Sequence, residues 1–333
     1  MSESRLSLQD ASQLATDILV KANTSVVNAR SVTDALVAAE RDGQYGHGLS
    51  RLPSYAAQSA SGKVAGHAVP KVTLSEKGCI RIDAGNGFAF PALDMARQQL
   101  TSGATECGIC AASIYRSHHF GQAGYQVEQL ADQGLVALAF GNSPKAIAPW
   151  GGADALFGTN PIAFAAPRLS KPSLVIDLSL SKVARGKIMV AAENNTAIPE
   201  AWAFDAEGHP TSDPERALAG TMAPMGDAKG AALVMMVEVL AAALTGANFG
   251  SEASSFFSPD GPPPGVGQLL IVIDPQAMSA GSFSQRLEFL INQIEAQPGS
   301  RLPGSRRLEH RAISDREGLN IKTELLNKLQ ALV

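Results

Sequence analysis

The hydrophobic positions of the chain change their spacing along its length. Apolar residues near the N-terminus recur at helical intervals, first after the potential capping residue Ser7 and again over about 26–39. Further helices are predicted over 52–61, 91–100, 122–133, 229–244, 283–297 and 323–332. Short apolar runs predict strands over 79–83, 108–114, 134–140, 162–166, 174–178 and 268–274. Because buried strands alternate with helices, the pattern favours a layered α/β core behind a helical N-terminal segment.

Composition narrows the class of protein. The chain has 333 residues, 45% of them hydrophobic and 17% charged, which suits one large or two medium globular domains. A net charge of −4 argues against a nucleic-acid surface. The most apolar helical stretch, 231–245, is too short to span a bilayer, and the first residues do not resemble a signal peptide. We therefore expect a cytoplasmic protein that binds neither membranes nor nucleic acids.

A glycine-broken stretch follows the second predicted helix. Gly43, Gly46 and Gly48 interrupt regular structure around His47, and Arg51 follows four residues later. A histidine can donate a proton, and an arginine can hold a carboxylate through two parallel hydrogen bonds. The alternative interpretation is an ordinary surface loop with a solvated histidine and arginine.

The segment 85–90 nearly matches a dinucleotide-binding fingerprint but fails at its last position. The strand at 79–83 is followed by Gly85 and Gly87, but Phe90 stands where the third glycine belongs. A phenylalanine there would prevent close packing of the following helix. We therefore predict a glycine turn at 85–90 and no cofactor site.

Several other polar segments lie at the ends of predicted strands, where ligands commonly bind in open α/β sheets. The turn 117–121 precedes a helix whose free N–H groups could bind phosphate, whereas adjacent His118 and His119 make a poor metal site. Thr159 could contact a polar ligand or belong to a simple Asn-Pro turn. Asp177 could accept hydrogen bonds from a cofactor or only cap its strand.

Two basic segments complete the candidates. Asp227 is expected to be a helix N-cap, and Lys229 in the first helical turn opposes the helix dipole, which suggests another role. The segment 301–307 places Gly304 beside Arg306 and Arg307, as would suit the adenosine end of a dinucleotide or a basic surface loop.

Taken together, these segments resemble one family, the malate/L-lactate dehydrogenases that lack the usual Rossmann fold. The motifs that carry the resemblance are 39–43 with His47-Gly48 and Arg51, 117–121, 156–162, 176–179 with Gly186-Lys187, 229–230 with 236–238, and 301–304. The family includes malate, lactate, sulfolactate and ureidoglycolate dehydrogenases, diketogulonate reductase and the cyclic imine reductases that act on Δ1-piperideine-2-carboxylate or Δ1-pyrroline-2-carboxylate.

The resemblance implies a fold, an activity and a set of site residues. It implies a layered mixed α/β sheet and a homodimer that transfers a hydride between NADPH or NADH and the carbon beside a carboxylate, with NADPH slightly favoured. A cofactor-binding lobe is expected at 114–274, and a substrate and dimerisation lobe at 1–113 with 275–333. By likeness, His47 donates the proton, while Arg51, Thr159 and Lys187 bind the substrate. No metal is expected. The cofactor-binding residues implied are His119, Phe120, Gly121, Gln122, Ala123, Asp177, Leu178, Ser179, Asp227, Lys229, Gly304, Arg306 and Arg307.

Departures from the family pattern leave three functions open. Gly46 stands where a serine is common, and Lys187 stands where the imine reductase has the aspartate that orients its histidine. The first hypothesis is an oxidoreductase for a 2-oxo acid or 2-hydroxy acid of the malate, lactate or sulfolactate kind, because Lys187 would suit an extra acidic group. The second is a cyclic imine reductase that produces L-pipecolate or L-proline. The third is a ligand-binding paralogue with weakened catalysis.

Overall fold

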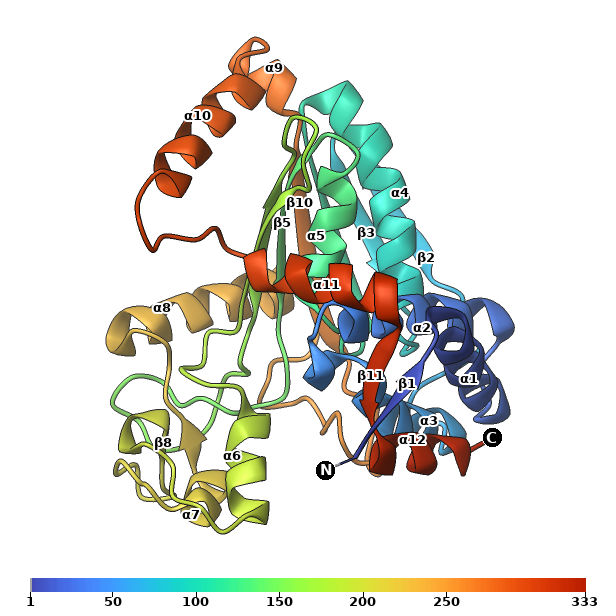
Figure 1. Ribbon diagram of the computed structural model, residues 1–333, viewed down its shortest axis with the longest axis vertical. Coiled ribbons are helices and arrows are strands. Elements are labelled where there is room, and N and C mark those ends of the chain that lie inside the picture. The colour runs from blue at the N-terminus through green and yellow to red at the C-terminus, as the bar shows by residue number, and fades with distance from the viewer. Residues whose placement is uncertain (1) are drawn as a thin grey trace.

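The computed structural model describes residues 2–333 and is organised around a seven-stranded sheet (Figure 1). Its strand order is β2-β3-β4-β10-β5-β6-β7. The pair β3–β4 is parallel, and the other neighbouring pairs are antiparallel. The mixed sheet predicted from the sequence is therefore confirmed. The strand bounds are β2 Lys71–Glu76, β3 Cys79–Asp83, β4 Ile109–Ser117, β5 Val136–Gly141, β6 Ile162–Ala166, β7 Leu174–Leu178 and β10 Val266–Ile273.

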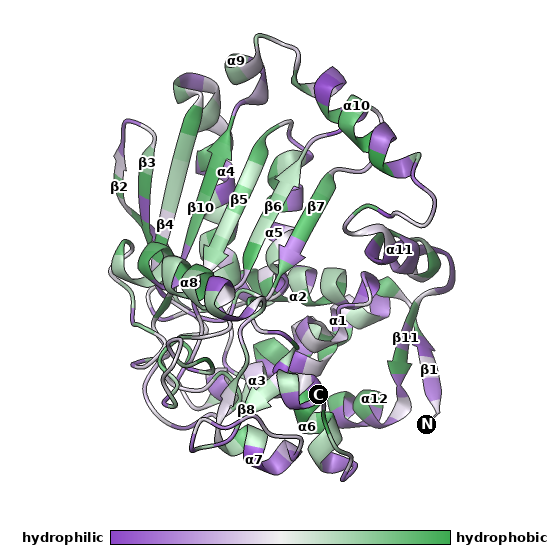
Figure 2. Ribbon diagram, turned by 90° about the vertical axis from the view of Figure 1, so that its left-hand side faces the viewer, coloured by the Kyte–Doolittle hydropathy of each residue, from purple (hydrophilic) through white to green (hydrophobic). Residues whose placement is uncertain are grey.

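Helices cover the two faces of the sheet unequally. Helices α4 (Ala89–Cys107) and α5 (Ala123–Ala131) pack on one face, where alanines such as Ala137 and Ala163 let the helices approach closely. Helix α8 (Asp227–Glu238) and its π-helical continuation η4 (Val239–Ala243) lie on the other face. Figure 2 shows that α8 crosses only one end of these strands and leaves much of that face in view.

The N-terminal helices form a second core with the C-terminal elements. Helices α1 (Leu8–Lys21) and α2 (Val26–Arg41) begin at the capping residues Ser7 and Ser25, and α3 (Leu52–Ala60) follows the glycine-broken loop. Strand β1 (Glu3–Leu6) pairs with β11 (Leu319–Lys322), next to α12 (Thr323–Gln330). This pairing brings the two ends of the chain into one layer beneath the sheet, as Figure 1 shows.

The polar and short elements were missed in the sequence. These are β1, β2, β11, α6 (Arg185–Glu193), β8 (Ala203–Phe204), α7 (Pro214–Ala219), β9 (Thr221–Met222), α9 (Pro275–Ser279) and α11 (Ser305–Glu317). Arg306 and Arg307, for which a basic surface loop was one of two interpretations, are helical instead, because α11 begins at Ser305 after the left-handed residue Gly304. The predicted α10 (Phe283–Glu295) is present.

The division into two lobes stays a prediction. Its boundary at 113/114 falls inside β4, and the single sheet takes strands from both predicted lobes. No helix within residues 2–333 is both long and apolar enough to cross a bilayer.

Candidate active site

The loop that carries His47 is anchored to helix α2 by Glu40. Helix α2 ends at Arg41, and two short 3₁₀ turns then cover Tyr45–His47 and Leu49–Arg51. The buried Glu40 carboxylate accepts a hydrogen bond from the backbone N–H of Leu49 at 2.8 Å. A Cβ atom at position 48 would lie only 2.1 Å from the same oxygen, so this close approach requires Gly48. Burial raises the pKa of Glu40 to about 7, despite the opposing effect of the Leu49 hydrogen bond.

His47 lies against a second histidine. Its ring is stacked on that of His119, with centroids 5.4 Å apart and planes 12° from parallel. Among the described residues, its buried Nδ1 atom has no hydrogen-bond partner. Burial, and secondly the charge of Arg51, lower the pKa of His47 to about 4. The imidazole is therefore neutral at pH 7 in the free protein.

Two contacts fix the guanidinium group of Arg51, while one of its nitrogen atoms has no partner in the described chain. Its Nε donates to the carbonyl of Gly46 at 2.7 Å, and the ring of Phe257 lies 4.6 Å from its Cζ. Within residues 2–333, the buried Nη1 atom has no partner. A Cβ atom added at position 46 would meet no described atom within 4 Å, so packing does not require Gly46. The glycine in place of serine therefore removes a hydroxyl that the loop has room for.

The turn after β4 brings two more histidines into the cluster. His119 Nδ1 shares a 2.5 Å hydrogen bond with the buried hydroxyl of Tyr55. His118 Nε2 lies 3.1 Å from Gln58 Oε1. Burial lowers the pKa of both histidines, that of His118 to about 3. Within residues 2–333, no group of three His, Cys, Asp or Glu side chains could hold a metal ion.

The predicted cofactor segments meet around β7. The first turn of α5 follows Gln122, and the N–H of Gly124 donates to Asp177 Oδ2 at 2.7 Å. A Cβ atom on Gly304, the residue that begins α11, would lie 3.2 Å from the carbonyl oxygen of Val175. The N-termini of two helices therefore approach one strand, beside the exposed side chains of Leu178 and Ser179. Phe120 and Gly121 lie between the histidines and this region in the chain. Phe120 packs against a glycine, and Gly121 packs against an aromatic ring.

Four other predicted residues belong to segments around and beyond the end of β7, where the N–H of Leu180 donates to the carbonyl of Thr159 at 2.9 Å and that of Met225 to the carbonyl of Leu180 at 2.8 Å. The prediction that Asp227 caps α8 was wrong, because Gly226 is the N-cap and Asp227 has a positive φ of 57° without a capping hydrogen bond. Lys229 is exposed in the first turn of α8. The backbone N–H of Thr159 donates to Ser143 Oγ at 3.1 Å. Lys187 is exposed on α6, with its Nζ 6.0 Å from the ring centroid of Trp202.

Arg306 and Arg307 have different surroundings. Arg307 is buried and pairs with Glu128 at 2.6 Å and with Asp42 at 2.9 Å, so its charge is already neutralised by the protein. Arg311 completes this four-residue network by contacting the same two carboxylates. Arg306 is exposed, and no ion pair of its guanidinium is found among residues 2–333. A joint role for both arginines in binding a phosphate is therefore not favoured by this geometry, whereas Arg306 remains available.

Sequence reasoning missed several residues of the cluster. Tyr55 and Gln58 contact the two histidines, and Phe256 packs 5.2 Å from both imidazoles. Tyr55 and Gln58 in α3 follow its N-cap Arg51 at spacings of four and three residues, which places the three on one side of the helix and is a signal present in the sequence. Phe256 and Phe257 lie about 200 residues after Arg51, in a proline-rich loop. No local sequence pattern links them to the histidines.

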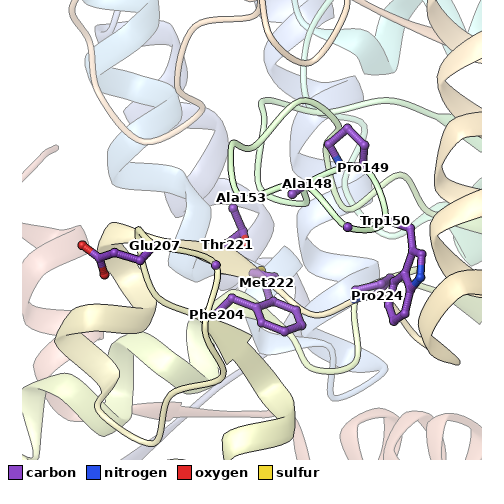
Figure 3. A pocket seen from close by; sticks show the side chains of 12 residues that line it. Ala148, Pro149, Trp150, Ala153, Phe204, Glu207, Thr221, Met222 and Pro224 are labelled. Carbon is purple, nitrogen blue, oxygen red and sulfur yellow. The ribbon is translucent and has the colours of Figure 1, made fainter.

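A separate hollow of about 330 Å³ lies between the loop 148–153 and strands β8 and β9. Figure 3 shows the rings of Trp150, Phe204 and Pro224 beside it, while the carboxylate of Glu207 points away. The predicted site residues do not line this hollow within the described chain. It is mainly apolar and lacks the combination of histidine and arginine found in the His47 cluster.

Comparison with known proteins identifies the family. The family model described as malate/L-lactate dehydrogenase matches residues 6–330. The chain belongs to the malate/L-lactate dehydrogenase family. It is 49% identical to the (2R)-3-sulfolactate dehydrogenase (NADP(+)) of Chromohalobacter salexigens, with 98% of this chain and 97% of the relative covered. It is 41% identical to a Δ1-pyrroline-2-carboxylate/Δ1-piperideine-2-carboxylate reductase of Pseudomonas putida, with 92% and 90% covered.

A solved family member has the same fold. The Δ1-piperideine-2-carboxylate reductase from Pseudomonas syringae pvar. tomato superposes with a TM-score of 0.94 at 41% identity, over 99% of this chain and 100% of that one. The family resemblance and fold predicted from the sequence are therefore confirmed. As a member of this family, the protein is an NAD(P)-dependent oxidoreductase. The name of the sulfolactate relative specifies NADP(+), which is consistent with the expected NADPH.

Proposed function

We propose that this family member interconverts a 2-oxo acid and a 2-hydroxy acid, with Arg51 as the carboxylate ligand and His47 as the proton carrier. One observation carries the proposal: a neutral imidazole and a guanidinium on the same loop each have a buried polar atom without a partner in the described chain. Such an atom typically costs about 1–3 kcal/mol, so two of them together are expected where a ligand completes the hydrogen bonding.

The surroundings of β7 suit a nicotinamide dinucleotide. The N-terminus of α11 offers backbone N–H groups for a phosphate, and the carboxylate of Asp177, which already accepts from Gly124 at the start of α5, can accept further hydrogen bonds. Glycine at position 304 keeps the backbone of α11 close to β7. When bound, the cofactor supplies or accepts the hydride. The protein must then hold the substrate carboxylate, carry one proton and exclude water.

The low pKa of His47 defines what the free protein can do. A neutral imidazole can accept the hydroxyl proton of a 2-hydroxy acid directly. For the reverse reaction the ring must first gain a proton. A carboxylate bound to Arg51 would offset the second cause of the low pKa and would favour that protonation. The same loop can therefore serve both directions.

The substrate within this class is a further proposal. The sulfolactate relative supports a 2-hydroxy acid with a second anionic group, and Lys187 is an exposed cation that could attract such a group. The second candidate is a cyclic imine reductase, which the reductases that resemble this chain support. The absent serine at position 46 and the lysine at position 187 favour the acid over the imine. They also motivate the alternative of a paralogue with weakened catalysis.

A substrate panel combined with two variants tests the proposal. NADPH and NADH oxidation should be measured with sulfopyruvate, oxaloacetate, pyruvate, Δ1-piperideine-2-carboxylate and Δ1-pyrroline-2-carboxylate. His47→Ala should lower kcat by about 10²–10⁴-fold and leave the Kd for NADPH nearly unchanged. Arg51→Lys keeps the charge but loses the two-pronged contact, so it should mainly raise KM.

Surface variants provide the controls for this test. His67 and Arg30 are exposed, so His67→Ala and Arg30→Lys should leave the kinetics unchanged. A His47→Ala protein with near-normal kcat would contradict the assignment. Oxidation of no cofactor with any compound of the panel would favour the ligand-binding paralogue. A clear preference for the imines would replace the first candidate by the second.

We also propose that the protein is a cytoplasmic homodimer, as the resemblance implies. The support is an apolar surface on α8 and η4, where Leu233, Met235, Met236 and Val239 are exposed. Helices that are apolar on all sides are normally buried, so a second copy of the chain is a suitable cover.

A further inference from the structure

The loop between η4 and β10 is tied to the end of α3 by a row of hydrogen bonds. The ammonium group of Lys63 donates to the carbonyl oxygens of Ser255, Ser258 and Asp260 at 2.7, 2.9 and 2.8 Å. Gln58 donates to the carbonyl of Phe256 at 2.8 Å, and Ser61 to that of Pro259 at 3.0 Å. We call residues 255–260 the strap. Five of its six carbonyl groups are thus held by side chains from one short stretch.

Lys63 has little freedom to release the strap. The residue is only 4% exposed, and its ammonium has three donor hydrogens, each of which meets a carbonyl oxygen. A shift of the strap would leave a buried charge without partners, which is costly. Phe256 is the one buried residue of the strap, and Ser255 and Phe257 on either side of it are exposed. Polar contacts with α3, Ser61 and Lys63, together with the burial of this one ring, therefore set the position of the strap.

The strap carries two aromatic rings into the active site. Phe256 packs against His118 and His119, and Phe257 covers one face of the Arg51 guanidinium at 4.6 Å. The Phe257 side chain is still 53% exposed, so the part of the ring not facing Arg51 is open. Its carbonyl is the one in the strap that receives no hydrogen bond from α3 or Lys63 within the described chain. Residue 257 is therefore held in place by the residues on both sides of it.

We infer that Phe257 is a specificity-determining residue of the substrate site and that Lys63 is a positioning residue that acts through it. The inference rests on the proposed function, because it takes Arg51 as the carboxylate ligand. Because the ring of Phe257 covers one face of the Arg51 guanidinium, the substrate carboxylate must bind in the guanidinium plane, at its N–H groups. The carbon chain of the substrate then extends past the edge of the ring, which limits the length of the substituent on that side.

The experiment compares Phe257→Ala, Lys63→Met and the double variant with the natural protein. The first readout is the Kd of oxalate, a carboxylate that cannot be reduced, measured by calorimetry. The second is kcat/KM for pyruvate, 2-oxobutyrate and 2-oxohexanoate with NADPH. Phe249→Ala and Lys71→Met are matched controls, because both side chains are exposed and neither takes part in the hydrogen bonds described above that hold the strap.

Phe257→Ala should weaken oxalate binding about two- to fivefold, as expected for a partly exposed cation–π contact. It should also raise kcat/KM for 2-oxohexanoate relative to pyruvate. Because Lys63 acts through the ring, the double variant should bind oxalate no more weakly than Phe257→Ala alone. Hydrogen exchange in Lys63→Met should be faster in the strap but unchanged in β4 and β10.

Three results would overturn the inference. These are an unchanged oxalate Kd and chain-length preference in Phe257→Ala, additive losses in the double variant, and failure of the natural protein to bind oxalate. Phe257 is exposed, so its replacement tests the inference even if Lys63→Met does not fold. Oxalate binding that depends on Phe257 without any turnover of acids or imines would contradict the proposed function alone, and the inference would stand.

Discussion

At the scale of single residues, the proposed role of His47 as the proton carrier predicts how the reaction depends on pH. Its pKa of about 4 in the free protein means that few molecules carry the proton needed for reduction at pH 7. Since kcat/KM reports pKa values of the free enzyme, this parameter should fall roughly tenfold per pH unit between about pH 5.5 and 8 for reduction of a 2-oxo acid. For oxidation of the hydroxy acid it should stay nearly flat over the same range. Reduction kcat/KM that does not change between pH 6 and 8 would show that His47 does not supply the proton.

Glu40 offers a second test at the same scale, this time of stability. Its pKa is raised from 4.5 to about 7, so between these values the folded protein binds more protons than the unfolded chain. The contribution of Glu40 is therefore fully favourable below pH 4.5 and is lost as pH rises through 7, by up to about 3 kcal/mol. Glu40→Gln should remove this part of the pH dependence, so its stability relative to the natural protein should improve from pH 5 to pH 8. Urea unfolding at both pH values measures this, and an identical difference at the two would contradict it.

At the scale of elements, α11 places two adjacent arginines in different surroundings, Arg306 exposed and Arg307 buried. Arg307→Met would leave Glu128 and Asp42 with one cation fewer, and breaking a buried pair in this way typically costs about 3–5 kcal/mol. Arg306→Ala should leave the unfolding free energy within about 0.5 kcal/mol of its natural value. If Arg306 meets a ribose 2′-phosphate, its loss should weaken NADPH binding more than NADH binding. Denaturant unfolding and cofactor titration of both variants measure these effects, and equal losses for the two cofactors would leave Arg306 as a surface charge.

The elements also show which local patterns can be read from the sequence. Helices with capping serines, such as α1 and α2, and strands with continuous apolar runs, such as β5, were predicted close to their observed positions. The polar β2, with every residue exposed, has no periodic signal. Helix α11 was missed because its residues are largely charged and its partners Glu128 and Asp42 are distant in the sequence. Asp227 was misassigned because a good capping residue can also occupy a strained first position.

At the scale of the whole molecule, the site is assembled by contacts between distant segments. The loop at His47, the turn at His119 and the strap are separated by about 70 and 135 residues in the chain. His47 and Arg51 could be placed together from the sequence because they share a loop. The family resemblance implied that the segment at His119 belongs to the same site. Neither the sequence nor the resemblance could show that Lys63 would position Phe257 over Arg51, since Phe257 lies about 190 residues after Lys63 in the chain.

The fold leaves the apolar surface of α8 and η4 uncovered. Met235 and Val239 lie one helical turn apart on α8 and η4, and each is more than half exposed, at 53% and 55%. Figure 2 shows this helix crossing a sheet face that is otherwise open. If two copies of the chain bury this face, replacing both residues with lysine should convert a dimer into a folded monomer, because desolvating two charges in an apolar contact is costly. Sedimentation velocity of the double variant should show half the natural mass with an unchanged far-UV spectrum. Val69→Lys is the control, because Val69 is 72% exposed in the loop before β2 and belongs to neither α8 nor η4. A natural protein that sediments as a monomer, or a double variant that stays dimeric, would contradict the proposed interface.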